Sequence, residues 1–170
     1  LNDAVVIVVG DVGQIRAQVE AAVPGAPDLV VTRACEDEAV GKARWDVYLG
    51  GSGGVSTTAT PWALPDLGEG TSYAALEGAA ACRSGRGPGY GLAHADGDGV
   101  LDLIVTEDCG DVTVGAGIWR VYAGSASGGF SATGVDWALP EYETGSSPFL
   151  ALSARADCSQ GDLPAYDAAD

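Results

Sequence analysis

The chain alternates short apolar segments with glycine-rich polar turns. The residues from Asp102 to Glu107 form a near-continuous apolar run, which is typical of a strand covered on both faces. The residues from Ile118 to Ala123 set Ile, Arg and Tyr against Trp, Val and Ala, as in a strand with two different faces. A third short strand is predicted from Tyr90 to Ala93. Glycine supplies 26 of the 170 residues, which fits many turns, so the pattern predicts an all-β protein.

The following segment continues this pattern. Gly124 to Gly129 is a glycine–serine turn, and Phe130 to Leu139 predicts a fourth, irregular strand. A further apolar piece runs from Phe149 to Leu152. Four antiparallel strands joined by hairpins match one blade of a β-propeller. Near the start of the chain, Asp11 to Val23 fits either a short capped helix or a pair of strands, and we favour the strands slightly.

An internal repeat covers most of the chain. At a separation of 74 positions, Asp28-Leu-Val-Val-Thr32 recurs as Asp102-Leu-Ile-Val-Thr106, Cys35 as Cys109, and Trp45-Asp-Val-Tyr48 as Trp119-Arg-Val-Tyr122. The later pairs are Trp62-Ala-Leu-Pro65 with Trp137-Ala-Leu-Pro140 at 75 positions, and Cys82 with Cys158 and Tyr90 with Tyr166 at 76. Matching residue types that stay in phase indicate tandem structural modules.

The phase of the repeat divides the chain into four parts. Residues 1–26 are a degenerate N-terminal segment that starts the first blade, and residues 27–90 are the first repeat. Residues 91–166 are the second repeat, and residues 167–170 start a third. Two blades and the start of a third leave sheet faces uncovered, since each blade packs only against its neighbours. We therefore expect a partial propeller, either a fragment of a longer polypeptide, which we favour, or a unit that assembles with copies of itself.

The second repeat contains an acidic turn at residues 94–102, His94-Ala-Asp-Gly-Asp-Gly-Val-Leu-Asp102. Its three aspartates are close enough in the chain to repel one another unless a cation binds among them. Hard oxygen ligands on a glycine turn suit Ca²⁺. The expected ligands are Asp96, Asp98, Asp102, the carbonyl of Val100 and His94. The alternative is a solvated Asp-Gly hairpin turn that binds no metal.

With the repeat and this turn together, the chain resembles the FG-GAP/VCBS family. These are the calcium-loop β-propeller repeats of integrin α-subunit heads and of many secreted bacterial proteins. The family pattern, Asp-x-Asp-Gly-Asp-Gly-x-x-Asp followed by Leu, is matched from Asp96 to Leu103, whereas His94 replaces the first aspartate. The resemblance covers about residues 27–170 and implies a structural cation that pins the hairpin of each blade. In the first repeat only Gly25 and Asp28 match, so no cation is expected there.

The charge balance excludes several classes of partner. Acidic residues outnumber basic ones by 24 to 8, which gives a net charge of −16. Phosphate binding needs clustered basic residues, so nucleic acid is not an expected partner. No apolar run approaches the roughly 20 residues of a membrane-spanning helix, so membrane insertion is not expected.

Four cysteines occupy two equivalent places in the repeat. Their spacing does not match a paired Cys-x-x-Cys zinc site, so disulfides in an oxidising compartment are the better interpretation. A hairpin of Tyr90–Ala93 with the strand after Asp102 would bring Cys82 near Cys109, which leaves Cys35 and Cys158 for neighbouring repeats. The competing arrangement pairs cysteines within a repeat, Cys35 with Cys82 and Cys109 with Cys158.

The recurring tryptophans fit blade-to-blade packing, and Trp62 and Trp137, beside prolines, are the better candidates for an exposed sugar contact. A single histidine, with no Gly-x-Ser-x-Gly motif, gives no support for an enzyme. The leading hypothesis is therefore a non-enzymatic, extracellular propeller segment, stabilised by Ca²⁺ and disulfides, for adhesion, surface structure or assembly. It would bind a protein partner or self-assemble through neighbouring blades. The alternatives are a carbohydrate-binding propeller that uses the tryptophans and a non-catalytic domain of a secreted enzyme.

Overall fold

The computed structural model describes residues 5–8, 28–68, 71–78, 82, 87–125, 127–140, 153–154 and 166–167. Within these residues the regular structure is β-strand with no α-helix, which confirms the all-β prediction. The strands are β1 (Val5–Val8), β2 (Leu29–Arg33), β3 (Arg44–Tyr48), β4 (Gly50–Gly51), β5 (Gly54–Val55), β6 (Thr60–Ala63), β7 (Gly89–Ala93), β8 (Asp102–Glu107), β9 (Ile118–Tyr122), β10 (Val135–Ala138), β11 (Ser153–Ala154) and β12 (Tyr166–Asp167).

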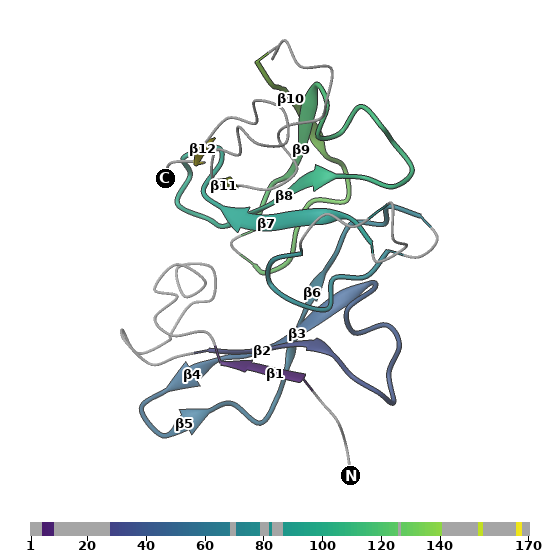
Figure 1. Cartoon of the computed structure of the whole chain (residues 1–170). Coiled ribbons are helices and arrows are strands. Elements are labelled where there is room, and N and C mark those ends of the chain that lie inside the picture. The colour runs from purple at the N-terminus through teal and green to yellow at the C-terminus, as the bar shows by residue number, and fades with distance from the viewer. Residues whose placement is uncertain are drawn as a thin grey trace.

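Two four-stranded antiparallel sheets make up most of the described structure. Sheet I has the order β1-β2-β3-β6, and sheet II has the order β7-β8-β9-β10, so in each the strands follow one another along the chain. Figure 1 shows sheet I in the lower half of the view and sheet II in the upper half. The ladders β4–β5 and β11–β12 are two-stranded. Among the described strands no closed barrel or propeller is formed.

Residues that match in sequence occupy matching positions in the two sheets. Leu29 lies opposite Tyr48 in sheet I, and their counterparts 74 positions later, Leu103 and Tyr122, lie opposite each other in sheet II. The tryptophans behave in the same way. Trp45 pairs with Trp62, and Trp119 pairs with Trp137. The sequence repeat therefore corresponds to two sheets with the same strand order and register.

Most strand predictions agree with the structure, and one was wrong in part. The strand predicted from Asp102 to Glu107 is β8, with the same ends, and Tyr90–Ala93 lies within β7. The fourth strand was predicted from Phe130 to Leu139, but β10 begins only at Val135. The first five residues of the predicted strand are not part of β10, and the ring of Phe130, the first of them, packs against the tryptophans of sheet I.

The main core lies between the two sheets. Sheet I contributes the face that carries Val30, Trp45, Val47 and Trp62, and sheet II contributes the face of Leu103 and Val105 with residues on either side of them. Side chains alternate between the faces of a strand, so each sheet turns one of its two faces to this core. The whole buried cluster contains Val30, Trp45, Val47, Trp62, Leu64, Tyr73, Tyr90, Leu101, Leu103, Val105, Val114, Tyr122 and Phe130.

A hairpin of sheet II closes the core over the tryptophans of sheet I. We call residues 124–125 and 127–130, between β9 and β10, the Phe130 hairpin. The ring of Phe130 lies edge-on to Trp45 and to Trp62, with centroids 6.0 and 6.1 Å apart. The Phe130 amide donates to the carbonyl of Ala63 at 3.2 Å. This contact joins the hairpin to the edge strand of sheet I and fixes how the two sheets stack.

The connection between the sheets is also packed into the core. Tyr73 is fully buried, and its hydroxyl donates to the carbonyl of Pro65 at 3.1 Å. The indole of Trp45 donates to the carbonyl of Tyr73 at 2.7 Å. Burial raises the pKa of the Tyr73 phenol well above its usual range. These contacts hold the connection against sheet I before the chain enters β7.

Several expectations fall outside the described residues. The choice between helix and strands for residues 11–23, the first acidic turn at residues 20–27 and the apolar piece at residues 149–152 belong to this group. The same holds for Cys158 and for the start of a third repeat at residues 168–170.

Candidate functional site

The acidic turn joins β7 to β8, and its last residue, Asp102, is fully buried. One carboxylate oxygen of Asp102 accepts a hydrogen bond from the amide of Gly124 at 2.8 Å. The other oxygen accepts from the amides of Ala95 and Asp96 at 2.8 and 3.3 Å. Both oxygens of Asp102 therefore bind backbone, and they connect the turn to the start of the Phe130 hairpin.

The two central aspartates are exposed and shape the turn itself. The amide of Asp98 donates to Asp96 Oδ1 at 3.0 Å, and the amide of Val100 donates to Asp98 Oδ1 at 2.7 Å. Gly97 and Gly99 have φ angles of 78° and 83°, which the chain adopts most readily at glycine. The glycine spacing is thus explained by backbone geometry alone, as in the solvated turn that was the alternative expectation.

His94 braces the turn from its other end. Its Nδ1 lies 2.9 Å from the carbonyl oxygen of Val100. Since a carbonyl only accepts, Nδ1 carries the proton in this contact. The Nε2 atom is buried and has no hydrogen-bond partner among the described residues. His94 and Val100 were both expected as cation ligands, but in the structure they are hydrogen-bonded to each other.

The turn contains the types of oxygen atom that bind Ca²⁺, but these atoms do not converge on one point. Carboxylate oxygens on a glycine-rich turn are the ligands that this hard cation prefers. In the part of the chain that the structure describes, however, no three His, Cys, Asp or Glu side chains form a group that could hold a metal ion. The donor chemistry fits Ca²⁺, whereas the positions of the donors match a turn held by its own backbone.

The counterpart of Asp102 in sheet I keeps the same structural contact. Asp28 is 2% exposed, and its Oδ1 accepts from the amide of Gly50 at 2.7 Å. Gly50 stands 22 residues after Asp28, as Gly124 does after Asp102. Asp28 Oδ2 is buried and finds no partner among the described residues. An aspartate at this position thus pins the following hairpin in both sheets, and sequence reasoning missed this role because the metal interpretation already explained the residue.

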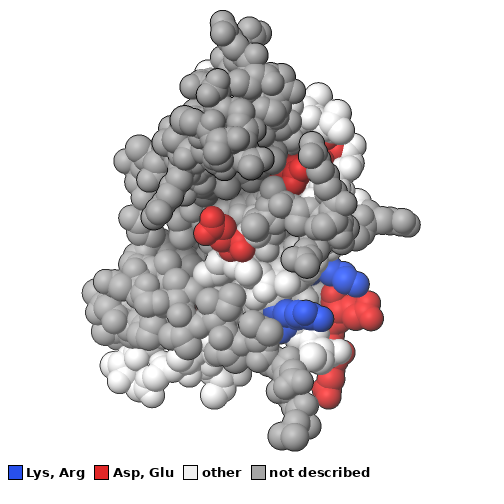
Figure 2. Space-filling view, in the orientation of Figure 1, with Lys and Arg blue, Asp and Glu red and all other residues white. Residues whose placement is uncertain are grey.

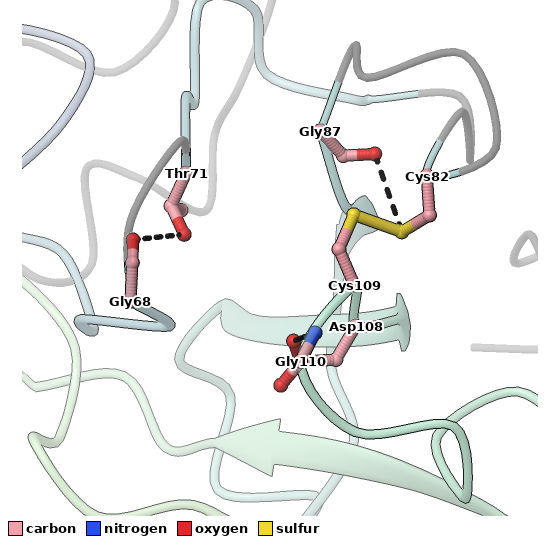
Figure 3. Close-up of a disulfide and its surroundings, with 7 residues drawn as sticks. All are labelled: Gly68, Thr71, Cys82, Gly87, Asp108, Cys109 and Gly110. Carbon is pink, nitrogen blue, oxygen red and sulfur yellow. Dashed lines mark hydrogen bonds between the residues drawn. A yellow bond between two sulfur atoms is a disulfide. The ribbon is translucent and has the colours of Figure 1, made fainter.

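A disulfide joins Cys82 to Cys109 across 27 positions, with Sγ atoms 2.11 Å apart. Cys109 lies two residues after β8 ends, and Gly89 at the start of β7 pairs with Glu107, so the bridge closes the open end of the β7–β8 hairpin. Figure 3 shows the bridge directly after Asp108 and beside Gly87. The preferred pairing of these two cysteines is confirmed, and the competing pairing of Cys35 with Cys82 and of Cys109 with Cys158 is wrong, since Cys82 and Cys109 are bound to each other.

Ion pairs stabilise the turns that follow β2 and β8. In sheet II the guanidinium of Arg120 contacts Asp136 at 2.7 Å and Asp111 at 3.0 Å. Hydrogen bonds from Thr113 and from Arg120 lower the pKa of the Asp111 carboxyl. In sheet I the counterpart Asp37 pairs with Arg44 at 2.6 Å, and this contact lowers the pKa of Asp37. Different arginines thus perform the same task in the two sheets.

The two tryptophans considered for sugar binding differ in exposure. Trp62 is 1% exposed because the Phe130 hairpin covers it, so no ring face is available to a ligand in solution. Trp137, its counterpart on β10, is 39% exposed. All four residues of β10 are exposed, from Val135 to Ala138. Only Trp137 therefore stays a candidate for an exposed contact.

The charged surface is acidic with local basic pairs. In Figure 2 the basic side chains on the visible face gather at one side of the molecule, next to acidic ones. Lys42, for example, lies 3.2 Å from Glu38. Among the residues described, no helix is long and apolar enough to cross a bilayer. Comparison of the chain with protein-family models, with curated proteins and with solved structures finds no match.

Proposed function

We propose that this chain is a non-enzymatic structural module, built from stacked propeller-like blades, that serves adhesion, surface structure or assembly outside the cytosol. The observation that carries this proposal is the contact between the Phe130 hairpin and the tryptophans of sheet I. In this contact one repeat covers the apolar face of the repeat before it. Proteins built from stacked repeats bury their cores in this way, and their exposed surfaces serve binding.

Backbone contacts that occur within both sheets support a module built twice on the same pattern. The amide of Leu64 donates to the carbonyl of Ala43 at 2.9 Å. The amide of Leu139 donates to the carbonyl of Gly117, also at 2.9 Å. The amides of two serines donate across the bases of the two hairpins, from Ser56 to Leu49 and from Ser131 to Ala123. Together with the paired contacts of Asp28 and Asp102, they indicate one architecture used twice.

The disulfide and the charge support a location outside the cytosol. A disulfide that closes a hairpin fits a non-reducing compartment, because cytosolic thiols are kept reduced. A net charge of −16 favours solubility and attracts cations. We include Ca²⁺ at residues 94–102 in the proposal, on the basis of donor type and spacing. Asp96 and Asp98 would hold it, since each has an oxygen that makes none of the turn's hydrogen bonds.

The interlocked stacking is tested by Phe130→Ala in the whole chain. Removing a buried aromatic ring between two sheets costs about 3–5 kcal/mol of unfolding free energy, measured by urea denaturation. The matched control is Val112→Ala, because Val112 is 85% exposed and its change should stay within about 0.5 kcal/mol. Equal stability of the two variants would show that the sheets do not depend on this contact, and the proposal would then lose its basis.

A carbohydrate-binding module is the second candidate, and the exposure of Trp137 is the observation that favours it. Aromatic rings on a surface stack on the apolar faces of sugars. A glycan array with the parent chain and with Trp137→Ala separates the candidates. Saturable binding that the variant loses would replace the structural proposal with the carbohydrate one, whereas no binding by either chain would remove the second candidate.

A further inference from the structure

Residues that face the core on sheet I have counterparts in the second repeat that lie on the outer face of sheet II. On sheet I, Trp45 and Trp62 point into the core, and their counterparts on sheet II are Trp119 and Trp137. On sheet II the core-facing residues of β8 and β9 include Leu103 and Tyr122, which are cross-strand neighbours. Trp119 belongs to the other face of β9, because it is one position out of phase with Ile118 and Arg120. Sheet II therefore carries a tryptophan pair on its outer side.

The converse holds for sheet I. Leu103 and Tyr122, the neighbours through which sheet II packs on sheet I, are 0% and 5% exposed. Their counterparts Leu29 and Tyr48 are also neighbours, on the outer face of sheet I, and both are partly exposed. The outer face of sheet I thus carries a partly exposed counterpart of the pair through which sheet II packs.

The hairpins have the same relationship. We call residues 50–55, which form β4 and β5, the Val55 hairpin. It follows β3 as the Phe130 hairpin follows β9. In the repeat, Val55 is the counterpart of Phe130, and the second hairpin has one inserted residue. Gly50 pairs with Val55, and Gly124 pairs with Phe130. Phe130 is 8% exposed against the tryptophans of sheet I, whereas Val55 is 43% exposed.

A glycine in each hairpin gives the sharpest evidence. Gly128 lies against Trp62, and a Cβ at Gly128 would stand 2.5 Å from the indole Nε1, so no larger residue fits there. Its counterpart, Gly53, has open space around the position of a Cβ, with nothing within 4 Å. Nothing within the described chain requires glycine at position 53. A tryptophan docked over this position would account for a glycine there, as Trp62 does at Gly128, where a φ of 94° also favours glycine.

The exposed edge of sheet II supplies that tryptophan. Trp137 and Val135 are 39% and 62% exposed on β10, whereas Trp62 on the corresponding strand β6 is 1% exposed. In sheet I the carbonyl of Ala63 accepts from the Phe130 amide. Ala138 occupies the equivalent position on β10 and is exposed. The edge strand that is covered in sheet I therefore has an exposed counterpart in sheet II, whereas further in on the same face Ile104 and Val121 are only 3% and 4% exposed.

We propose that the Val55 hairpin of one molecule docks on the Trp137 edge of a second copy of this chain, at the place that the Phe130 hairpin takes on Trp62. This inference rests on the proposed function, because it extends the same stacking from within the chain to between chains. Gly53 would lie over the Trp137 ring, and the Val55 amide would donate to the Ala138 carbonyl. The interface is heterologous, since different surfaces meet, so association runs head to tail and ends in a ring or a filament.

The test is sedimentation velocity of the whole chain from about 1 μM to several hundred μM. The parent chain should show a weight-average sedimentation coefficient that rises with concentration. Gly53→Gln places a side chain in open space in the monomer but in the path of the docked tryptophan, and Trp137→Gln removes the ring. Each should weaken association by about 30-fold or more, as loss of an interface hot spot does. The control Val112→Gln should associate like the parent.

Each outcome decides the proposal. A parent that stays monomeric at all concentrations overturns it, and so does association that Gly53→Gln and Trp137→Gln leave unchanged, because a different surface then meets. An equimolar mixture of the two variants adds a positive test, since one intact hairpin and one intact edge should restore dimers but not longer species. If Phe130→Ala is destabilising while the parent is monomeric, the stacking function stands and only the intermolecular contact fails.

Discussion

Asp102 and Gly124 are joined by a hydrogen bond of 2.8 Å from the glycine amide to the buried carboxylate. The bond ties the first residue of β8 to the start of the hairpin that covers sheet I. Asp28 and Gly50 repeat it at 2.7 Å in sheet I, where Ala22 and Pro24 occupy the places of the two middle aspartates. An aspartate at this position therefore has a structural task that does not depend on a metal.

Replacing Asp102 should be far more costly than replacing Asp98. Asp102→Ala leaves the amides of Gly124 and Ala95 without their acceptor, and a buried unsatisfied donor costs about 1–3 kcal/mol. We expect a loss of roughly 3 kcal/mol or more in urea denaturation with EGTA present. Asp98→Ala, at an exposed position, should lose about 1 kcal/mol or less under the same conditions. Equal losses would contradict a metal-independent role for Asp102.

Calcium should stabilise the parent chain and not the Asp98→Ala variant. A ligand that binds only the folded state at 100 times its dissociation constant adds about 2.7 kcal/mol. The melting temperature of the parent should therefore rise when EGTA is replaced by millimolar Ca²⁺, and that of Asp98→Ala should rise less. Mg²⁺ serves as the control cation, because it dehydrates reluctantly and demands a stricter geometry. The same melting temperature with and without Ca²⁺ would remove the cation from the proposed function.

Breaking the Cys82–Cys109 bridge should destabilise sheet II. A cross-link that closes a loop of about this length contributes roughly 3 kcal/mol by restricting the unfolded chain. The double variant Cys82→Ser, Cys109→Ser should therefore unfold at a lower urea concentration than the parent. A reductant should not change the stability of the double variant through this bridge. It should lower the stability of the parent towards that of the double variant. No difference between the two proteins in oxidising buffer would show that the bridge does not constrain the fold.

Alkali should unfold the chain through its buried tyrosines. Burial raises the pKa of Tyr90 from 10.0 to about 12, because the phenolate is disfavoured in the core. A raised pKa means that the stabilisation is fully present below pH 10 and is lost as the pH rises towards 12, by roughly 2 kcal/mol. Urea midpoints measured at pH 7, 10, 11 and 12, with absorbance at 295 nm, should show the decline together with phenol ionisation.

Tyr90→Phe provides the matched variant for this experiment. It removes the hydroxyl that donates to the Ala75 carbonyl at 3.0 Å, so it should lose about 1 kcal/mol at pH 7. Its stability should then fall less steeply between pH 10 and 12, because one titrating group is gone. An unchanged slope would show that Tyr90 does not carry the alkaline sensitivity.

Local patterns predicted the strands well where neighbouring residues decide the outcome. The apolar run of β8 and the alternation of β9 appear in the sequence because pleated strands place successive side chains on opposite faces. The Cys82–Cys109 bridge followed from the same hairpin. The metal site did not follow in the same way. Asp96 and Asp98 satisfy amides two residues away, and a residue list does not show whether a carboxylate turns to its backbone or to a cation.

The sequence by itself determined that this is an all-β chain with two matching units, because periodicity and repetition are properties of order along the chain. Only the tertiary structure decided which copy of each matched residue is buried. Trp62 and Trp137 have equivalent neighbours in sequence, yet one is 1% and the other 39% exposed. The difference arises because Phe130 comes after the first sheet in the chain and packs back over it, and burial depends on what lies across the face rather than along the strand.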